Sequence, residues 1–222
     1  MKKMNKLSTS KIYKIFGRKK GRKKNNNSIL NNSKYLISNF TKKLQDKEII
    51  IDIGFGNGES TIFLSKKYTD KEIIASDVYN DGNIKLIKKI KENNLKNISI
   101  FNQNILMLID QINFSINLSQ VWILFPDPWP KKKHHKRRLV NEDFLQKIAN
   151  MMKKNGKIVI ATDSTQYFFS IICSISNLDC LKWINDIPKK WQYSNQNLPE
   201  TNFYKKALKN KRIPKIIILS KI

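Results

Sequence analysis

Short apolar runs alternate with longer amphipathic stretches from about residue 48 to the end of the chain. The runs predict strands over residues 48–53, 72–76, 97–101, 120–125, 157–162 and 215–220. Between them, apolar residues recur at intervals of three and four, which predicts helices over residues 59–68, 83–93, 142–154 and 165–174. This alternation predicts an α/β fold with a doubly wound, mostly parallel sheet and helices on both faces. Ligands bind such sheets beyond the carboxyl ends of the strands.

The first thirty-odd residues lack this periodicity, are basic and contain no acidic residue. We therefore expect a flexible basic arm over residues 1–32 and one folded domain over residues 33–222. No apolar run approaches the roughly 18 residues of a membrane-spanning helix or the roughly 7 to 15 residues of a secretory signal. Cys173 and Cys180 lie in apolar contexts without partners, which favours buried free thiols in a reducing compartment. A cytoplasmic protein without a membrane partner is therefore expected.

Charge is segregated along the chain of 222 residues, whose formal net charge is +26. The total alone says little, because a composition rich in Lys, Ile and Asn is what A/T-rich codons produce. Residues 1–45 carry 14 positive and no negative charges, residues 131–138 carry six positive charges, and residues 189–222 carry nine against a single glutamate. The rest of the chain has a net charge of −2. Three basic segments on a nearly neutral domain favour a polyanionic partner, most commonly nucleic acid.

Three of the seven glycines follow the first predicted strand, as Gly54, Gly56 and Gly58. Glycines at this spacing let the backbone turn tightly and approach a ligand. The dinucleotide fingerprint is G-x-G-x-x-G, whereas the spacing here is G-x-G-x-G. Glu59 opens the following helix, where a carboxylate would repel a pyrophosphate. A dinucleotide is therefore disfavoured as the ligand.

Two acidic residues accompany the glycines at the same edge of the predicted sheet. Asp52 would direct a carboxylate at the turn, which suits a ligand with an ammonium group such as S-adenosylmethionine. Asp77 closes the next strand and is placed to accept hydrogen bonds from ribose hydroxyls. The alternative is a tight turn followed by a helix cap. Convergence of both acids with the glycines favours the cofactor site.

Three of the six prolines follow the fourth predicted strand, at positions 126, 128 and 130. Alternate prolines restrict the backbone, so we expect Asp127 to be held in a stiff, extended loop. Trp129 offers a face on which a base can stack, and the basic residues 131–138 can engage phosphates on either side. The alternative is a proline-rich turn with Trp129 in the core. The adjoining charge favours a nucleic-acid site.

His134 and His135 are the only histidines. Adjacent imidazoles point in different directions, no nearby Cys or acid completes a set of ligands, and the surrounding cations disfavour a metal ion. We expect these side chains to contact RNA or solvent and expect no metal.

Four segments resemble the bacterial tRNA (guanine-N7)-methyltransferases. They are Phe125–Lys131 with His134 and Lys136–Val140, Asp52–Gly58, Ala161–Asp163 with Tyr167, and the basic stretch Phe16–Arg22. The resemblance covers nearly the whole chain in order. It implies a seven-stranded, Rossmann-like class I methyltransferase fold. It further implies methyl transfer from S-adenosyl-L-methionine to N7 of guanosine 46 in the tRNA variable loop, by a monomer or a homodimer.

The resemblance also implies roles for individual residues. The cofactor positions would be Asp52, Gly54, Gly56, Gly58, Asp77, Asn104 and Asp127, with Asp127 also catalytic. The tRNA positions would be Lys131, Asp163, Thr201, Asn202, Phe203 and Tyr204. Four of these residues depart from the family pattern: Asp52, Asp77 and Tyr204 stand where glutamates are usual, and Asn104 replaces an acid.

Three other classes of protein share parts of this pattern. An amino-directed adenine or cytosine methyltransferase should have a second proline before the aromatic residue, but Trp129 directly follows Pro128. A nicotinamide-dependent oxidoreductase should show the dinucleotide glycine spacing. A non-catalytic RNA-binding module explains the charge but gives the ordered glycine and proline segments no purpose.

Overall fold

The protein is described here from a computed structural model that covers residues 14, 30, 33–39, 44, 46–112, 116–195 and 197–222. The expected flexible arm over residues 1–32 lies outside the described residues apart from Lys14 and Leu30. The basic stretch Phe16–Arg22 therefore stays a sequence-based prediction.

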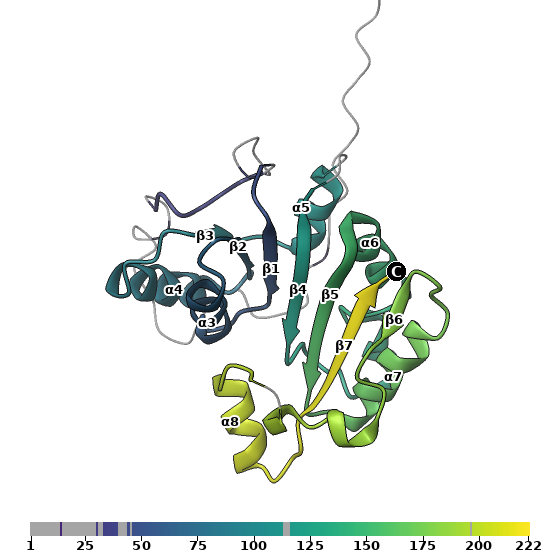
Figure 1. Cartoon of the computed structure of the whole chain (residues 1–222). Coiled ribbons are helices and arrows are strands. Elements are labelled where there is room, and N and C mark those ends of the chain that lie inside the picture. The colour runs from purple at the N-terminus through teal and green to yellow at the C-terminus, as the bar shows by residue number, and fades with distance from the viewer. Residues whose placement is uncertain are drawn as a thin grey trace, which may run out of the picture.

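Within the described residues, seven strands form one sheet in the order β3-β2-β1-β4-β5-β7-β6 (Figure 1). The strands are β1 (Ile49–Ile53), β2 (Glu72–Ser76), β3 (Ile98–Phe101), β4 (Leu118–Leu124), β5 (Met152–Thr162), β6 (Leu181–Trp183) and β7 (Lys215–Lys221). Strands β1 to β5 pair in parallel, and β7 runs antiparallel to both β5 and β6. The predicted doubly wound, mostly parallel sheet is confirmed.

Helices cover both faces of the sheet. The α-helices are α3 (Glu59–Lys67), α4 (Asn80–Glu92), α5 (Ile105–Gln111), α6 (Glu142–Met151), α7 (Thr165–Ile175) and α8 (Asn202–Lys209). Short 3₁₀ helices are η1 (Lys132–Arg137), η2 (Pro188–Lys190) and η3 (Tyr193–Asn195). Helices α5, α6 and α7 pack in one apolar cluster, while α3, α4 and α8 contribute to the other.

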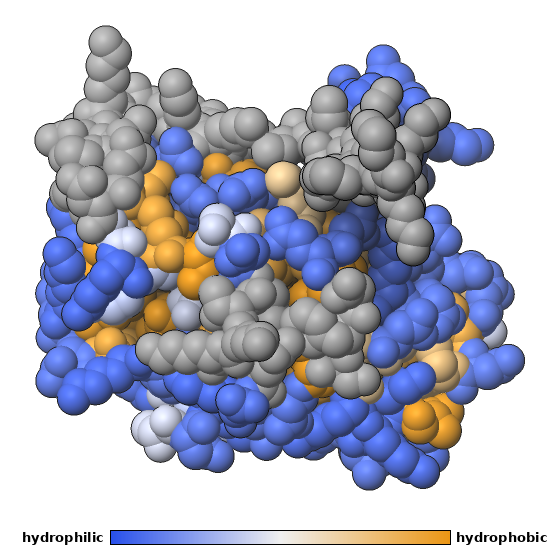
Figure 2. Space-filling view, turned by 90° about the horizontal axis from the view of Figure 1, so that it is seen from above, coloured by the Kyte–Doolittle hydropathy of each residue, from blue (hydrophilic) through white to orange (hydrophobic). Residues whose placement is uncertain are grey.

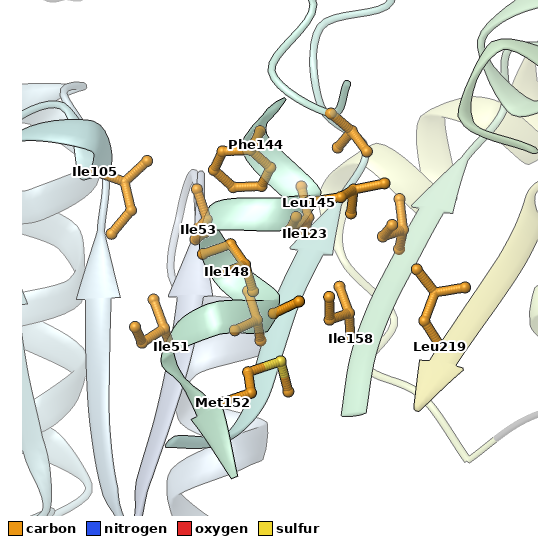
Figure 3. Close-up of a cluster of buried hydrophobic side chains, with 14 of the residues drawn as sticks. Ile51, Ile53, Ile105, Ile123, Phe144, Leu145, Ile148, Met152, Ile158 and Leu219 are labelled. Carbon is orange, nitrogen blue, oxygen red and sulfur yellow. The ribbon is translucent and has the colours of Figure 1, made fainter. Parts of the chain in front are cut away.

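Side chains of each strand alternate between these two clusters. In β1, Ile49, Ile51 and Ile53 face the α5–α7 side, where Figure 3 shows Ile51 and Ile53 beside residues of α6. Ile50 packs in the α3–α4 cluster, and Asp52 shares its side of the strand. The strand pattern therefore sends the Asp52 side chain toward α3.

Among the strands and α-helices of the described residues, β6, α5 and α8 were not predicted from the sequence. β6 has three residues, too few for a visible alternation. The predicted helix over 142–154 ends earlier, because Met152 already pairs with Leu118 as part of β5. A register shift follows between Leu118 and Gln120, and Asn155 has a φ of 63°. This irregular start of β5 breaks the alternation that marks a strand.

The outer edge of β3 is covered by the chain segment 33–39. The amide of Ile37 donates to the carbonyl of Ile100 at 2.9 Å, and the amide of Ile100 donates to the carbonyl of Tyr35 at 2.7 Å. Viewed from above, from the amino-terminal ends of the parallel strands, hydrophilic residues surround an area where hydrophobic residues are visible (Figure 2). No helix in the described part of the chain is long and apolar enough to cross a membrane.

The expectation that both cysteines are buried is wrong for Cys173, which is exposed, while Cys180 is half-buried. Helix α7 buries Tyr167, Phe168, Ile171 and Ile175, and this choice of face leaves Cys173 on the outer side of the helix.

Candidate active site

A cleft of about 1190 Å³ opens at the carboxyl ends of β1, β2 and β4. Two sequence windows contribute to its wall: the glycine window, residues 54–58, and the proline window, residues 126–130. The residues that line the cleft include Gly54, Gly56, Asp77, Asn104, Asp127, Trp129 and Phe203. Lys14 of the basic arm also lines it. The parallel topology thus brings segments 70 residues apart to one edge, as predicted.

The glycine turn requires glycine at each of its three positions. Gly54, Gly56 and Gly58 have φ values of 72°, 60° and 84°, a left-handed region that strains other residues. Asp77 holds this turn in place: its Oδ2 accepts a hydrogen bond from the Gly56 amide at 2.8 Å, and its Oδ1 accepts one from the Tyr79 amide at 2.9 Å. Asp77, which directly follows β2, therefore organises the turn that follows β1.

Asp52 does not line the cleft. It is 1% exposed, and its Oδ2 accepts hydrogen bonds from the hydroxyls of Ser60 at 2.7 Å and Thr61 at 2.6 Å. Its Oδ1 is buried without a hydrogen-bond partner in the structure. Burial raises the pKa of Asp52 to about 6, against the lowering effect of the two hydroxyls. This placement differs from the expected orientation toward the turn, because the strand directs the short side chain to α3.

The cleft concentrates negative charge at Asp77 and Asp127. Burial raises the pKa of Asp77, and the nearby Asp127 carboxylate raises it further, while the Gly56 amide lowers it. Asp127 stands open to solvent at the mouth of the cleft, yet the protein around its carboxylate still raises its pKa. Among the described residues, no hydrogen bond or ion pair reaches the Asp127 carboxylate. These partly desolvated acids suit a cationic ligand.

The proline loop is rigid but not fully extended. Phe125 and Trp129, each followed by a proline, have φ values of 56° and 42°. The expectation of an extended loop is wrong at these two residues. The following proline excludes the right-handed α region, and their positive φ values lie in the left-handed region instead of the extended one. Arg138 fixes the loop: it is 6% exposed, its Nε donates to the Pro128 carbonyl at 2.9 Å, and its guanidinium lies 4.9 Å from the centre of the Tyr167 ring.

Trp129 lies in the wall of the cleft and not in the core. The edge of His134 meets its ring at a centroid distance of 5.8 Å, and the Arg137 guanidinium lies 5.0 Å from the ring centre. Residues of the basic run therefore support the aromatic ring that borders the site. Among the described residues, no cluster of His, Cys, Asp or Glu could hold a metal ion.

Asn104 lines the cleft and caps α5. Its Oδ1 accepts a hydrogen bond from the Leu106 amide at 3.0 Å. An amide oxygen has a second lone pair, so it can still accept from a ligand.

The six residues expected at tRNA positions have different environments. Lys131 is exposed at the start of η1. Asp163 forms an ion pair with Arg212 at 3.2 Å. Of the four residues at the start of α8, Phe203 lines the cleft, and the Nδ2 of Asn202 donates to Glu59 at 2.8 Å.

Thr201 and Tyr204 are buried, whereas direct contact of their side chains with tRNA would require exposure. The Thr201 hydroxyl accepts a hydrogen bond from the Tyr204 amide at 3.1 Å and so caps α8. Tyr204 is 9% exposed, and its ring stacks on that of Tyr193 with centroids 4.7 Å apart. Both side chains are occupied in holding the helix.

Sequence reasoning missed Gly82 in α4. A Cβ at this position would lie 2.1 Å from the carbonyl oxygen of Gly56. Gly82 therefore allows α4 to pack directly on the glycine turn. Gly82 lies one residue before the predicted helix over 83–93, and the structure extends that helix back to Asn80, so the sequence pattern gave no packing signal for it.

Comparisons with known proteins identify the family of this chain. Residues 46–215 match a protein family described as putative methyltransferase. A tRNA (guanine-N(7)-)-methyltransferase from Neorickettsia sennetsu is 30% identical over 183 residues, which cover 82% of this chain and 84% of the relative. One from Wolbachia pipientis wMel is 33% identical over 212 residues, which cover 93% of this chain and 91% of the relative.

Among solved structures, a putative methyltransferase from Streptococcus mutans in complex with SAH superposes with a TM-score of 0.53 at 19% identity. The superposition covers 81% of this chain and 92% of that one. Together with the order of the sheet, this likeness defines a Rossmann-like class I methyltransferase fold. Because the relatives are matched over most of both chains, the protein belongs to the tRNA (guanine-N7)-methyltransferase family.

Proposed function

We propose that this protein transfers a methyl group from S-adenosyl-L-methionine to N7 of guanosine 46 in the variable loop of tRNA. The names of its relatives support tRNA as the substrate and guanine N7 as the target. The observation that carries the proposal is the cleft itself, where two partly desolvated acids border a glycine turn. We expect the enzyme to act in the cytoplasm, where its substrate is found, as a monomer or a homodimer.

The residues of the cleft fit this methyl donor. S-adenosylmethionine carries two positive charges, on the sulfonium and the ammonium, which suit the negative charge of Asp77 and Asp127. The buried Oδ1 of Asp52 lacks a hydrogen-bond partner behind the same turn, so a nearby cation would offset its desolvation. Glu59, in the first turn of α3, makes the same place unfavourable for a pyrophosphate. Asp77 and Asn104 offer acceptor oxygens for the nucleoside part.

The donor, when bound, supplies an electrophilic methyl group. Guanine N7 already has an in-plane lone pair, so the reaction needs no general base. The protein then has to align the two reactants and stabilise the positive charge that develops on the purine. Asp127 is suited to the second task, because its carboxylate is held at the mouth of the cleft by a loop that Arg138 fixes.

The exposed basic residues near the cleft are the ones that we expect to contact RNA. Lys136 and Arg137 of η1 line the cleft, and the exposed Lys131 directly precedes this helix, so these side chains can bind phosphates. Asp163 uses one carboxylate oxygen in its ion pair with Arg212, which leaves the other oxygen able to accept a hydrogen bond from RNA. The target base has to leave the folded tRNA to reach the cleft, at a cost of about a few kcal/mol. Trp129 offers a ring at the cleft wall against which a displaced base can pack.

Labelled S-adenosylmethionine and undermodified tRNA test the proposal directly. We expect label in tRNA, located by nuclease digestion at N7 of guanosine 46. A tRNA with adenosine at position 46 is the matched control and should take up no label. Label on another base would support a different base methyltransferase, and no label in RNA would refute the enzyme assignment.

A further inference from the structure

Helix α8 lies across the carboxyl edge of the sheet, near the ends of β4 and β5 and beside α3 (Figure 1). Its first residue, Asn202, is tied to α3 by the hydrogen bond from Nδ2 to Glu59 Oε1. The next residue, Phe203, reaches the glycine turn: a Cβ at Gly56 would lie 3.3 Å from its Cε2 atom. The Phe203 ring therefore packs against the backbone of the turn.

Phe203 is nevertheless 49% exposed, and it lines the cleft. A half-exposed aromatic ring is not stabilising by itself, because much of its apolar surface stays in water. A ligand seated on the glycine turn would cover that surface. The contact with Gly56 thus places an apolar wall beside the acids that suit the cationic part of the donor.

A ladder of aromatic rings anchors the same helix to the proline loop. Tyr204 stacks on Tyr193 with ring centroids 4.7 Å apart and an interplanar angle of 27°. Tyr193 in turn meets Phe125 with centroids 5.6 Å apart, and Phe125 opens the loop that carries Asp127. The Tyr193 hydroxyl donates to the Pro199 carbonyl at 2.5 Å, which fixes the middle ring. Helix α8 is therefore held between the two windows of the site.

We propose that Phe203 is a binding residue for the methyl donor, and that Tyr204 is a positioning residue that holds Phe203 in the cleft through the ladder to Tyr193 and Phe125. This inference rests on the proposed function, since it assumes that the donor occupies the cleft. It assigns to Phe203 and Tyr204 a role in cofactor binding, whereas the family resemblance assigned both to tRNA. It also gives Tyr204 a purpose at a position where the family usually has a glutamate.

Calorimetric titration with S-adenosylhomocysteine, without RNA, tests the role of Phe203. We expect Phe203→Ala to weaken binding about tenfold, because the variant leaves part of the ligand in water. Leu208→Ala is the matched control: Leu208 lies on the same helix and is also 49% exposed, but it does not line the cleft. It should bind like the wild type. Equal affinity of all three proteins would overturn the inference.

The role of Tyr204 is tested by a double-mutant cycle in the same assay. Tyr204→Phe keeps the ring and should bind normally, while Tyr204→Leu removes the stack and should weaken binding several-fold. If Tyr204 acts through Phe203, Tyr204→Leu should cause no further loss in the Phe203→Ala background. Independent, additive losses would exclude the positioning role. A wild-type protein that binds no S-adenosylhomocysteine would contradict the proposed function itself, which keeps the two failures distinct.

Discussion

Three aspartates illustrate how the surroundings of a residue decide its role. Asp77 is bound by two backbone amides, Asp52 by two hydroxyls, and Asp127 by no described group. Burial raises the pKa of all three. Sequence position therefore marks them as candidates, but only their contacts separate the organising, buried and open carboxylates.

Asp127→Asn should lower the rate of methyl transfer by about 10²- to 10³-fold, the usual effect of removing one electrostatic contact to the transition state. Single-turnover kinetics with labelled donor measure this rate. Binding of S-adenosylhomocysteine and of tRNA should stay near normal, because Asn has the same shape. Near-native turnover with both ligands bound would disprove the catalytic assignment.

The pH dependence of the reaction provides a second test of Asp127. The ionised carboxylate is the active form, and burial raises its pKa. The rate should therefore fall with decreasing pH, starting above the range of an ordinary aspartate. Rate profiles of the wild type and of Asp127→Asn should differ in this acid limb, and identical profiles would assign the limb to another group.

Asp52 should make the stability of the protein depend on pH. Its pKa is raised from 3.8 to about 6, so the folded state binds more protons than the unfolded state between these values. Stability then falls as pH rises from about 4 to about 6, by on the order of 3 kcal/mol for this group. Urea unfolding of the wild type and Asp52→Asn, without ligand, measures it. The stability difference between the two proteins should change between pH 4 and pH 7, and a constant difference would contradict the raised pKa.

At the scale of elements, regular patterning predicted most strands and helices, and exceptions have identifiable causes. The isoleucine-rich strands are buried on both sides, so their apolar runs are unmistakable. Helix α8 was missed because it is short and its packing depends on distant partners, such as Tyr193 and Gly56. The glycine and proline windows were located correctly, because a parallel sheet brings the ends of its strands together.

The packing of α4 on the glycine turn gives a prediction at this scale. Gly82→Ala would place a Cβ 2.1 Å from the Gly56 carbonyl oxygen, so the helix or the turn must move. We expect a loss of about 1–3 kcal/mol of stability and weaker binding of S-adenosylhomocysteine. Thermal unfolding and calorimetry measure the two effects.

Gly54→Ala is the comparison for this variant. A Cβ there would meet no atom within 4 Å, so only the φ of 72° opposes the substitution, at about 1–2 kcal/mol. The loss of stability in Gly54→Ala should therefore come from backbone strain alone. Unchanged ligand binding in Gly82→Ala would show that the contact with Gly56 is not required.

For the whole molecule, the net charge of +26 is distributed unevenly around a nearly neutral domain. Among the described residues, the basic run of η1 lies beside the cleft, whereas Lys154 and Lys157 lie near the amino-terminal ends of the strands, on the opposite side. The latter side is the surface seen from above in Figure 2. Basic residues near the cleft should contribute to the affinity for tRNA, and basic residues on the far side should not.

Salt dependence measures this difference. Affinity for tRNA should fall steeply with salt, while affinity for S-adenosylhomocysteine should barely change, because each phosphate contact contributes about −0.7 to −0.9 to the logarithmic slope. Replacing Lys132 and Lys133 by alanine should make the tRNA slope shallower by about one to two units. The double alanine variant of Lys154 and Lys157 removes the same charge and should leave the slope unchanged. Equal effects of both pairs would argue against a localised RNA surface.

The sequence by itself determined the class of fold, the two windows and the edge of the sheet where they meet, because burial periodicity and scarce glycines and prolines are local properties of the chain. The tertiary structure decided which of the candidate side chains are available to contact a ligand. It turned Asp52 toward α3, buried Thr201 and Tyr204, paired Asp163 with Arg212, and brought Phe203 onto Gly56. These outcomes depend on contacts between residues far apart in the chain, and no local pattern specifies which partner a side chain meets.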